Sequence, residues 1–80
     1  MNENEIIPRL NSVFRDVFGA DSISVTSRTT ADDIEDWDSL AHINLVAAVE
    51  NEFGVRFKMR EVSSMKNVGD MIKIISERGR

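Results

Sequence analysis

The sequence contains no cysteine, and this absence excludes a disulfide framework, a thiolate nucleophile and a metal site built on cysteine. The chain also starts without the basic segment and apolar run of a secretory signal. No apolar stretch approaches the roughly 20 residues that a membrane-spanning helix needs. These absences predict a cytoplasmic protein that has no contact with a membrane.

Positive charge is also in short supply, because 10 lysine and arginine residues stand against 14 aspartate and glutamate residues, for a net charge of −4. A mildly acidic chain is a poor match for nucleic acid and suits partner proteins with basic surfaces. The 80 residues are expected to form one domain, residues 1–80, with little room for an enclosed active site. We expect a monomer.

Helical periodicity is present from the start of the chain. Apolar residues recur at helical spacing between residues 4 and 18 and predict a helix with one buried face. Pro8 must then lie in the first turn, where its missing N–H would be unpaired in any case. Gly19 is the predicted stop, because glycine adopts the left-handed conformation easily. The predicted buried face consists of Ile6, Leu10, Val13, Phe14, Val17 and Phe18.

Between residues 20 and 38 the periodicity is lost, and Ser, Thr and Asp dominate. A loop of this length in so small a domain is often functional. We expect its scattered apolar residues, Trp37 among them, to tether it to the helices. A second helix is predicted for residues 39–53, with Asp38 as its N-cap and Gly54 as its stop.

The C-terminal part of the chain predicts a short helix and a longer one. Residues 59–64 are expected to form the short helix, and the last helix is expected to begin near Asn67. Asp70 lies three residues further on, where it could complete a capping box. Arg78 and Arg80 suit the negative C-terminal end of the helix dipole.

The predicted fold is therefore all-α. It is a four-helix bundle of three longer helices and one short helix, with a long loop between the first two. The four methionines are expected to fill gaps in its small core.

The second predicted helix has two apolar faces. At about 100° per residue, Leu40, Ile43 and Ala47 form a strip beside the core face, with Asn44 next to it. The long loop folds back over this strip, or the strip is a docking surface for other proteins, and both can hold at once. The core face consists of His42, Leu45, Val46, Val49 and Phe53, and His42 is interpreted as a partly buried imidazole with satisfied hydrogen bonds.

Ser39 is expected at the first turn of this helix, where position alone would favour a capping role. Its surroundings point elsewhere. The stretch WDSLAHI at residues 37–43 resembles the attachment motif of the acyl carrier protein family. The stretch VENEFGV at residues 49–55 resembles the end of that family's second helix, and NVGDM at residues 67–71 resembles the start of its fourth. The resemblance covers nearly the whole chain and is weakest over residues 1–35.

This resemblance implies a specific chemistry. A phosphopantetheinyl transferase moves a 4′-phosphopantetheine arm from coenzyme A to the hydroxyl of Ser39, with Mg²⁺ supplied at the transferase site. The thiol of the arm then carries acyl groups as thioesters to enzymes of fatty-acid, polyketide or related specialised biosynthesis. Asp38 orients the site and helps the transferase to dock. A short acyl chain can enter between the helices. The residues expected to contact partners are Leu40, Ile43, Asn44, Ala47, Glu50, Asp36 and Glu35.

Two features of the sequence refine this interpretation. Outward positions of the second helix that are acidic in fatty-acid-synthase carriers are here Ala41, His42, Asn44 and Asn51, which favours a discrete, specialised carrier. The carboxylates are concentrated instead in the acidic run at residues 32–38. That run lacks the ligand alternation and central glycine of a calcium-binding loop, so we predict a solvated loop without a metal.

Other functions remain open from the sequence. The chain could be a peptidyl or aminoacyl carrier, since the Trp-Asp-Ser form of the motif is also typical of those. It could be a helical interaction module that is never modified, with Ser39 serving only as a cap. A small hydrolase using Ser39 and His42 is disfavoured, because no third orienting group is evident.

Overall fold

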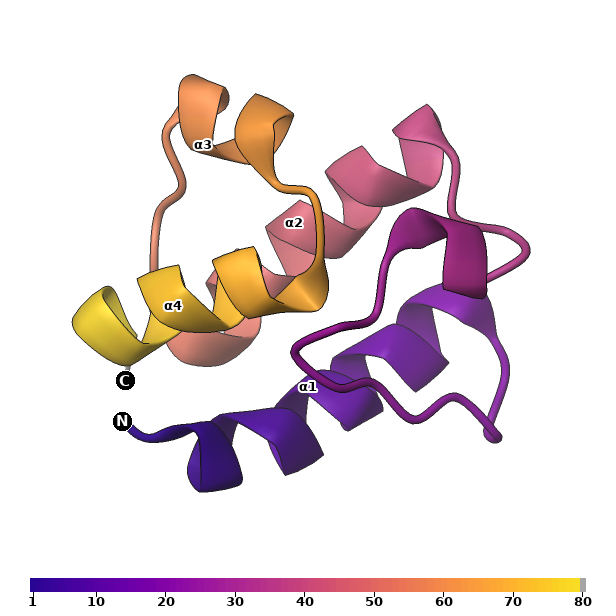
Figure 1. The fold of residues 1–80 in the computed structure, drawn as a ribbon, viewed down its shortest axis with the longest axis horizontal. Coiled ribbons are helices and arrows are strands. Elements are labelled where there is room, and N and C mark those ends of the chain that lie inside the picture. The colour runs from indigo at the N-terminus through magenta and orange to yellow at the C-terminus, as the bar shows by residue number, and fades with distance from the viewer. Residues whose placement is uncertain (80) are drawn as a thin grey trace.

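The computed structural model describes residues 1–79, and in that range the chain folds into four α-helices and one 3₁₀ turn. Figure 1 shows α1 along one side, α2 and α4 across it, and α3 in the connection between α2 and α4. The predicted all-α bundle, with three longer helices, one short helix and a long first loop, is confirmed. The elements are α1 (Glu3–Phe18), η1 (Ala31–Asp33), α2 (Ser39–Phe53), α3 (Met59–Ser64) and α4 (Val68–Arg78).

The first helix begins at Glu3, one residue before the predicted range, and the expectation that Pro8 lies in its first turn is wrong. Asn2 is the N-cap, and its side chain accepts from the N–H of Glu5 at 3.0 Å. Pro8 therefore lies in the second turn, and the helix continues through it. The carbonyl of Asn4, which Pro8 cannot bond, lies at an exposed residue where water can hydrate it. Gly19 ends the helix in the left-handed conformation with φ of 62°, as predicted.

The core lies where α1 packs against α2 and α4. The predicted core face of α2 is confirmed apart from His42, which is half-buried. In α1, Val17 and Phe18 are half-buried rather than buried, although the ring of Phe18 lies 6.1 Å from that of Trp37 in the loop. α3 contributes no fully buried side chain. The buried residues are Ile6, Leu10, Val13, Phe14, Val25, Leu45, Val46, Val49, Phe53, Val55, Val68, Met71, Ile72 and Ile75.

The long loop is tied to the helices at several points, as expected. Val25 is buried in the core, and its N–H donates to the side chain of Asn11 in α1 at 2.7 Å. The N–H of Gly69, in the first turn of α4, donates to the carbonyl of Ser27 at 2.8 Å. The η1 turn within the loop was not predicted. It depends on a local bond from the N–H of Thr30 to the carboxylate of Asp33, at 2.9 Å.

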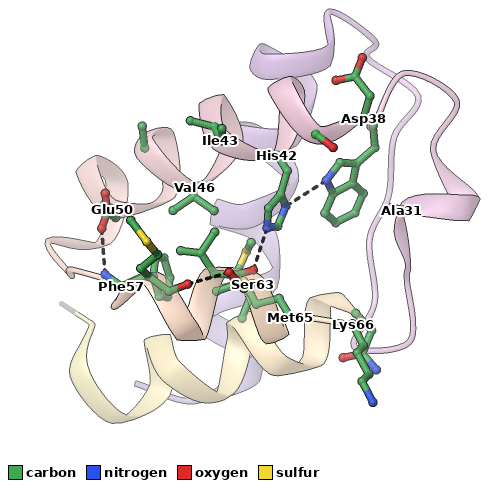
Figure 2. Close-up of a pocket in the computed structure, with 17 residues that line it drawn as sticks. Ala31, Asp38, His42, Ile43, Val46, Glu50, Phe57, Ser63, Met65 and Lys66 are labelled. Atoms are coloured by element: carbon green, nitrogen blue, oxygen red, sulfur yellow. Dashed lines mark hydrogen bonds between the residues drawn. The ribbon is translucent and has the colours of Figure 1, made fainter.

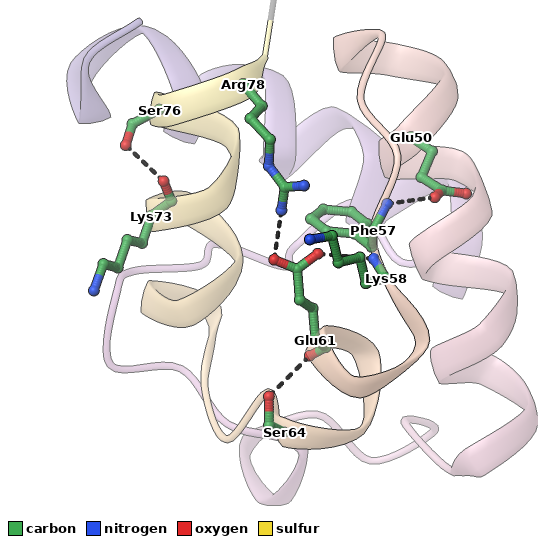
Figure 3. Close-up of polar contacts among 8 residues, drawn as sticks. All are labelled: Glu50, Phe57, Lys58, Glu61, Ser64, Lys73, Ser76 and Arg78. Carbon is green, nitrogen blue, oxygen red and sulfur yellow. Dashed lines mark hydrogen bonds and ion pairs between the residues drawn. The ribbon is translucent and has the colours of Figure 1, made fainter.

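The short helix and the last helix occupy the predicted positions. Asn67 caps α4 by accepting from the N–H of Asp70 at 3.0 Å. The carboxylate of Asp70 accepts from the N–H of Lys66 at 2.9 Å, so the reciprocal bond of the expected capping box falls one residue earlier. Arg78 reaches across to Glu61 of α3 at 2.6 Å (Figure 3). Arg80, expected at the same end, lies outside the described residues.

No helix among residues 1–79 combines the length and the apolar character needed to span a membrane.

Candidate functional site

Ser39 is the first residue of α2 and is exposed. It is not the cap, because the carboxylate of Asp38 accepts from the N–H of Ala41 at 2.8 Å and caps the helix as predicted. The carbonyl of Asp38 accepts the first intrahelical bond, from the N–H of His42 at 2.9 Å. Within residues 1–79, no hydrogen bond holds the hydroxyl of Ser39. A partner enzyme can therefore reach this oxygen directly.

The local electrostatics fit a phosphate on this oxygen. Ser39 lies at the N-terminal end of α2, which is the positive end of the helix dipole. Backbone N–H groups in the first turn of a helix lack intrahelical partners and favour an anion. A phosphodiester formed on Ser39 would lie at this end of α2. The residues present thus fit a phosphopantetheine group.

A cavity of about 900 Å³ opens beside Ser39 between α2, α3 and the start of α4. Figure 2 shows His42 and Val46 facing into it from α2, with Met65 on the opposite side. Much of its lining is apolar, so it can hold an acyl chain carried on an arm from Ser39. Its apolar lining includes Trp37, Ile43, Val46, Ala47, Phe57, Met59, Val62, Met65 and Met71.

Trp37 and His42 form a packed pair next to the serine. The indole N–H of Trp37 donates to Nδ1 of His42 at 3.1 Å, and Nε2 of His42 lies 3.3 Å from the carbonyl oxygen of Val62. Both ring nitrogens are thus engaged, as predicted for a structural imidazole. Where a hydrolase would place a carboxylate to orient its histidine, His42 has the indole donor instead. Trp37 packs edge-on against Phe14 at 5.4 Å, which confirms it as an anchor of the loop.

The apolar strip on α2 is open to solvent. Leu40 is 68% exposed and Ile43 is 62% exposed, so the loop does not fold back over them. Ala47 and Asn44 are exposed on the same helix. Met59 of α3 is 86% exposed, so the expectation that all four methionines fill the core is wrong.

The acidic residues expected at the site differ in their exposure to solvent. Glu35 and Asp36 are exposed in the turn before α2. Glu50 is half-buried, and its carboxylate accepts from the N–H of Phe57 at 2.8 Å, so it also holds the connector to α3 (Figure 3). Among residues 1–79, no three His, Asp or Glu side chains are grouped so as to hold a metal ion.

The sequence analysis missed the contribution of α3 and the residues after it. Met59, Val62 and Met65 line the cavity opposite α2. Their spacing of three residues was the available signal, but a six-residue helix gives too little periodicity to assign a face.

Glu61 joins α3 to α4 in the same region. The hydrogen bond from the Arg78 guanidinium, and after it the backbone N–H of Lys58, lower the pKa of the Glu61 carboxyl below its ordinary value of 4.5. The same pair raises the pKa of Arg78. This ion pair ties one wall of the cavity to α4.

An exposed serine at a helix start, beside an apolar cavity in a small helical bundle, defines a carrier of tethered groups. The comparisons with known proteins agree. The family model described as "Phosphopantetheine attachment site" matches residues 8–75. The chain belongs to this family, the acyl carrier proteins. It is a non-catalytic carrier that bears phosphopantetheine and serves fatty-acid or related biosynthesis.

Individual relatives cover almost the whole chain. An acyl carrier protein of Acidothermus cellulolyticus is 33% identical over 76 residues, which are 95% of this chain and 90% of that protein. A meromycolate extension acyl carrier protein of Mycolicibacterium aurum is 26% identical over 76 residues, 95% of this chain and 78% of that one. The solution structure of the holo acyl carrier protein of Geobacter metallireducens has a TM-score of 0.83 and 39% identity, covering 90% of this chain and 83% of that one.

Proposed function

We propose that Ser39 is the residue that carries the phosphopantetheine arm, which makes residues 1–80 one acyl-carrier domain. The proposal rests on one observation above all: Ser39 is exposed at the N-terminal end of α2, and no hydrogen bond from residues 1–79 holds its hydroxyl. In the transfer, Oγ of Ser39 attacks the phosphorus atom of coenzyme A that bears pantetheine. The Oγ–P bond forms, the bond from that phosphorus to the nucleotide part breaks, and the serine proton passes to a base of the transferase.

The chain itself supplies a presented nucleophile. Proximity and neutralisation of the phosphate charge come from the transferase and its Mg²⁺. The loaded thiol then carries the acyl group, which can rest in the cavity between α2 and α3. Because the arm and its enzymes draw on coenzyme A, we place the protein in the cytoplasm, acting as a monomer.

Intact-mass measurement tests the attachment site. The protein is incubated with a broad-specificity phosphopantetheinyl transferase, coenzyme A and Mg²⁺. The wild type should gain one phosphopantetheine mass, and Ser39→Ala should gain none. Ser12→Ala, which removes an exposed serine hydroxyl from α1, should be modified like the wild type. A mass gain in Ser39→Ala would show that another residue carries the arm.

Partners are proposed to dock on the exposed face around this serine. Its apolar centre is Leu40 and Ile43, whose exposure in an otherwise well-packed domain favours an interaction surface. Asp38 lies at its edge, beside the attachment oxygen. The remaining residues assigned to this face are Asn44, Ala47, Glu50, Asp36 and Glu35.

We further propose that this is a specialised carrier rather than the housekeeping carrier of fatty-acid synthesis. Of the four non-acidic positions expected to face outward on α2, Ala41 and His42 are half-buried in the structure, so that expectation was wrong for them. Asn44 and Asn51 are exposed, where a partner that reads acidic charge would need carboxylates. The connector and α3 beside it add positive charge. The exposed cations of residues 54–66 are Arg56, Lys58, Arg60 and Lys66.

A transfer assay tests this assignment. The holo protein is offered to the malonyl transferase of a bacterial fatty-acid synthase, which we expect to load it slowly. The variant with Asn44→Asp and Asn51→Glu should be loaded faster, because it restores acidic charge to α2. Fast loading of the wild type, unchanged in the variant, would contradict the specialised assignment and leave the attachment site intact.

A further inference from the structure

Two side-chain hydrogen bonds join residues before Ser39 to residues after it. One is the cap from the N–H of Ala41 to Asp38, at 2.8 Å. The other joins the indole of Trp37 to Nδ1 of His42, at 3.1 Å, and so bridges the serine from one side to the other. We propose that Trp37 and His42 are positioning residues that hold the first turn of α2 in shape for phosphopantetheine transfer. This inference rests on Ser39 being the attachment residue.

The indole determines which nitrogen of His42 carries the proton. An indole N–H can only donate, so Nδ1 must be the unprotonated acceptor. In the neutral ring the proton is then on Nε2, from which it is donated to the carbonyl of Val62 at 3.3 Å. The planes of the two rings lie 23° apart and their centroids 5.9 Å apart, as expected for rings joined edge to edge by this hydrogen bond. His42 therefore connects the turn before α2 to α3 through one defined tautomer.

Trp37 links this turn to the hydrophobic core. Its ring contacts Phe14, which is fully buried, and Phe18 at 6.1 Å. First turns of helices fray because their N–H groups lack intrahelical partners. The bond to His42 ties this turn to α1 and restrains fraying. The turn then loses less conformational freedom when a transferase binds it as a helix.

Substitutions that remove one hydrogen-bonding group each test the pair. Trp37→Phe keeps an aromatic ring against Phe14 but has no N–H donor, and His42→Phe has no acceptor. His42→Asn is the rescue, because its amide oxygen can accept near the position of Nδ1. With coenzyme A and a broad-specificity transferase, we expect kcat/KM to fall about three- to tenfold in each phenylalanine variant, the range of one neutral hydrogen bond. His42→Asn should recover most of the rate.

Two further readouts separate positioning from stability. The double variant should be no slower than His42→Phe alone, because that variant already lacks the acceptor for the indole N–H as well as the bond to Val62. In the wild type, long-range ¹H–¹⁵N spectra should show His42 with the proton on Nε2. A proton on Nδ1, additive losses in the double variant, or unchanged kcat/KM in folded Trp37→Phe and His42→Phe would each overturn the inference. A wild type that gains no mass would instead overturn the attachment site itself.

Discussion

Asp38 has an observed role as a helix cap and a proposed role in docking, and substitution can separate the two. Its carboxylate caps α2 through the N–H of Ala41, and it also places a negative charge next to the hydroxyl of Ser39. The first role needs only an oxygen acceptor, since asparagine and aspartate cap helices about equally well. The second role needs the charge, because a basic transferase surface would recognise it.

Asp38→Asn and Asp38→Ala distinguish the two roles. We expect Asp38→Ala to lower the free energy of unfolding by about 1 kcal/mol, because the cap is lost, and Asp38→Asn to change it by less than about 0.5 kcal/mol. Both should reduce kcat/KM of the transferase, since both lose the charge. Urea denaturation and the intact-mass assay measure the two effects. If Asp38→Asn is modified as fast as the wild type, Asp38 is a cap and not a docking residue.

Among the elements, α4 supports the long loop through its first turn. The N–H of Val68 donates to the carbonyl of Thr29, and that of Gly69 to the carbonyl of Ser27, both at 2.8 Å. A Cβ on Gly69 would lie 2.7 Å from the Ser27 oxygen, a distance at which the backbone must shift. Glycine is therefore required here by the close approach of the loop.

Gly69→Ala tests this support. We expect it to lower the free energy of unfolding by about 1–3 kcal/mol, because the loop must move and the bond to Ser27 is weakened or lost. Helix content by circular dichroism should stay the same, since alanine is a better helix former than glycine. Lys73→Ala, at an exposed position of the same helix, is the matched control and should be nearly neutral. An equally stable Gly69→Ala would show that the loop is not held by this turn.

The attachment of α3 to α4 should depend on pH. The guanidinium of Arg78, and after it the N–H of Lys58, lower the pKa of Glu61 in the folded protein below 4.5. A carboxyl whose pKa is lower in the folded than in the unfolded protein stabilises the folded state when it is ionised. This contribution is fully present above about pH 4.5 and is lost as the pH falls through the folded pKa. Both side chains face solvent, so the effect is local to α3.

A carbon-13 titration of the Glu61 carboxyl measures its pKa in the folded protein. In the wild type the midpoint should lie below 4.5, and α3 amide signals should shift with the same midpoint. In Arg78→Gln the midpoint should rise toward the ordinary value, because the charged donor is gone. Identical midpoints in the two proteins would mean that the ion pair has no role in solution.

The elements that the sequence predicted best are those with strong local signals. Asp38, Gly19 and Gly54 mark helix ends through rules that involve only neighbouring residues, and all three were assigned correctly. The exposure of Ile43 could not be decided, because it depends on the path of the preceding loop, which lacks a periodic pattern that would fix it. The lining by Met59 was missed for the same reason: a cavity belongs to several elements at once, and no single stretch encodes it.

At the scale of the whole molecule, stability and recognition lie on different faces. The core is buried between α1, α2 and α4, whereas Leu40 and Ile43 face solvent. α3 adds no buried side chain and forms one wall of the open cavity, where the carbonyl of Val62 accepts from Nε2 of His42. Changes on the exposed face of α2 should therefore alter partner binding without unfolding the bundle.

Leu40→Glu tests this separation, with Ser12→Glu as the matched control. Both add one negative charge at an exposed position of a helix, one at the docking face and one on α1. We expect each to change the free energy of unfolding by less than about 0.5 kcal/mol, since neither side chain is buried. Leu40→Glu should reduce kcat/KM of the transferase about tenfold or more, because a central apolar contact is replaced by a desolvated charge. Ser12→Glu should leave it unchanged. A large loss of stability in Leu40→Glu, or equal kinetics in both variants, would mean that the partner does not read this face.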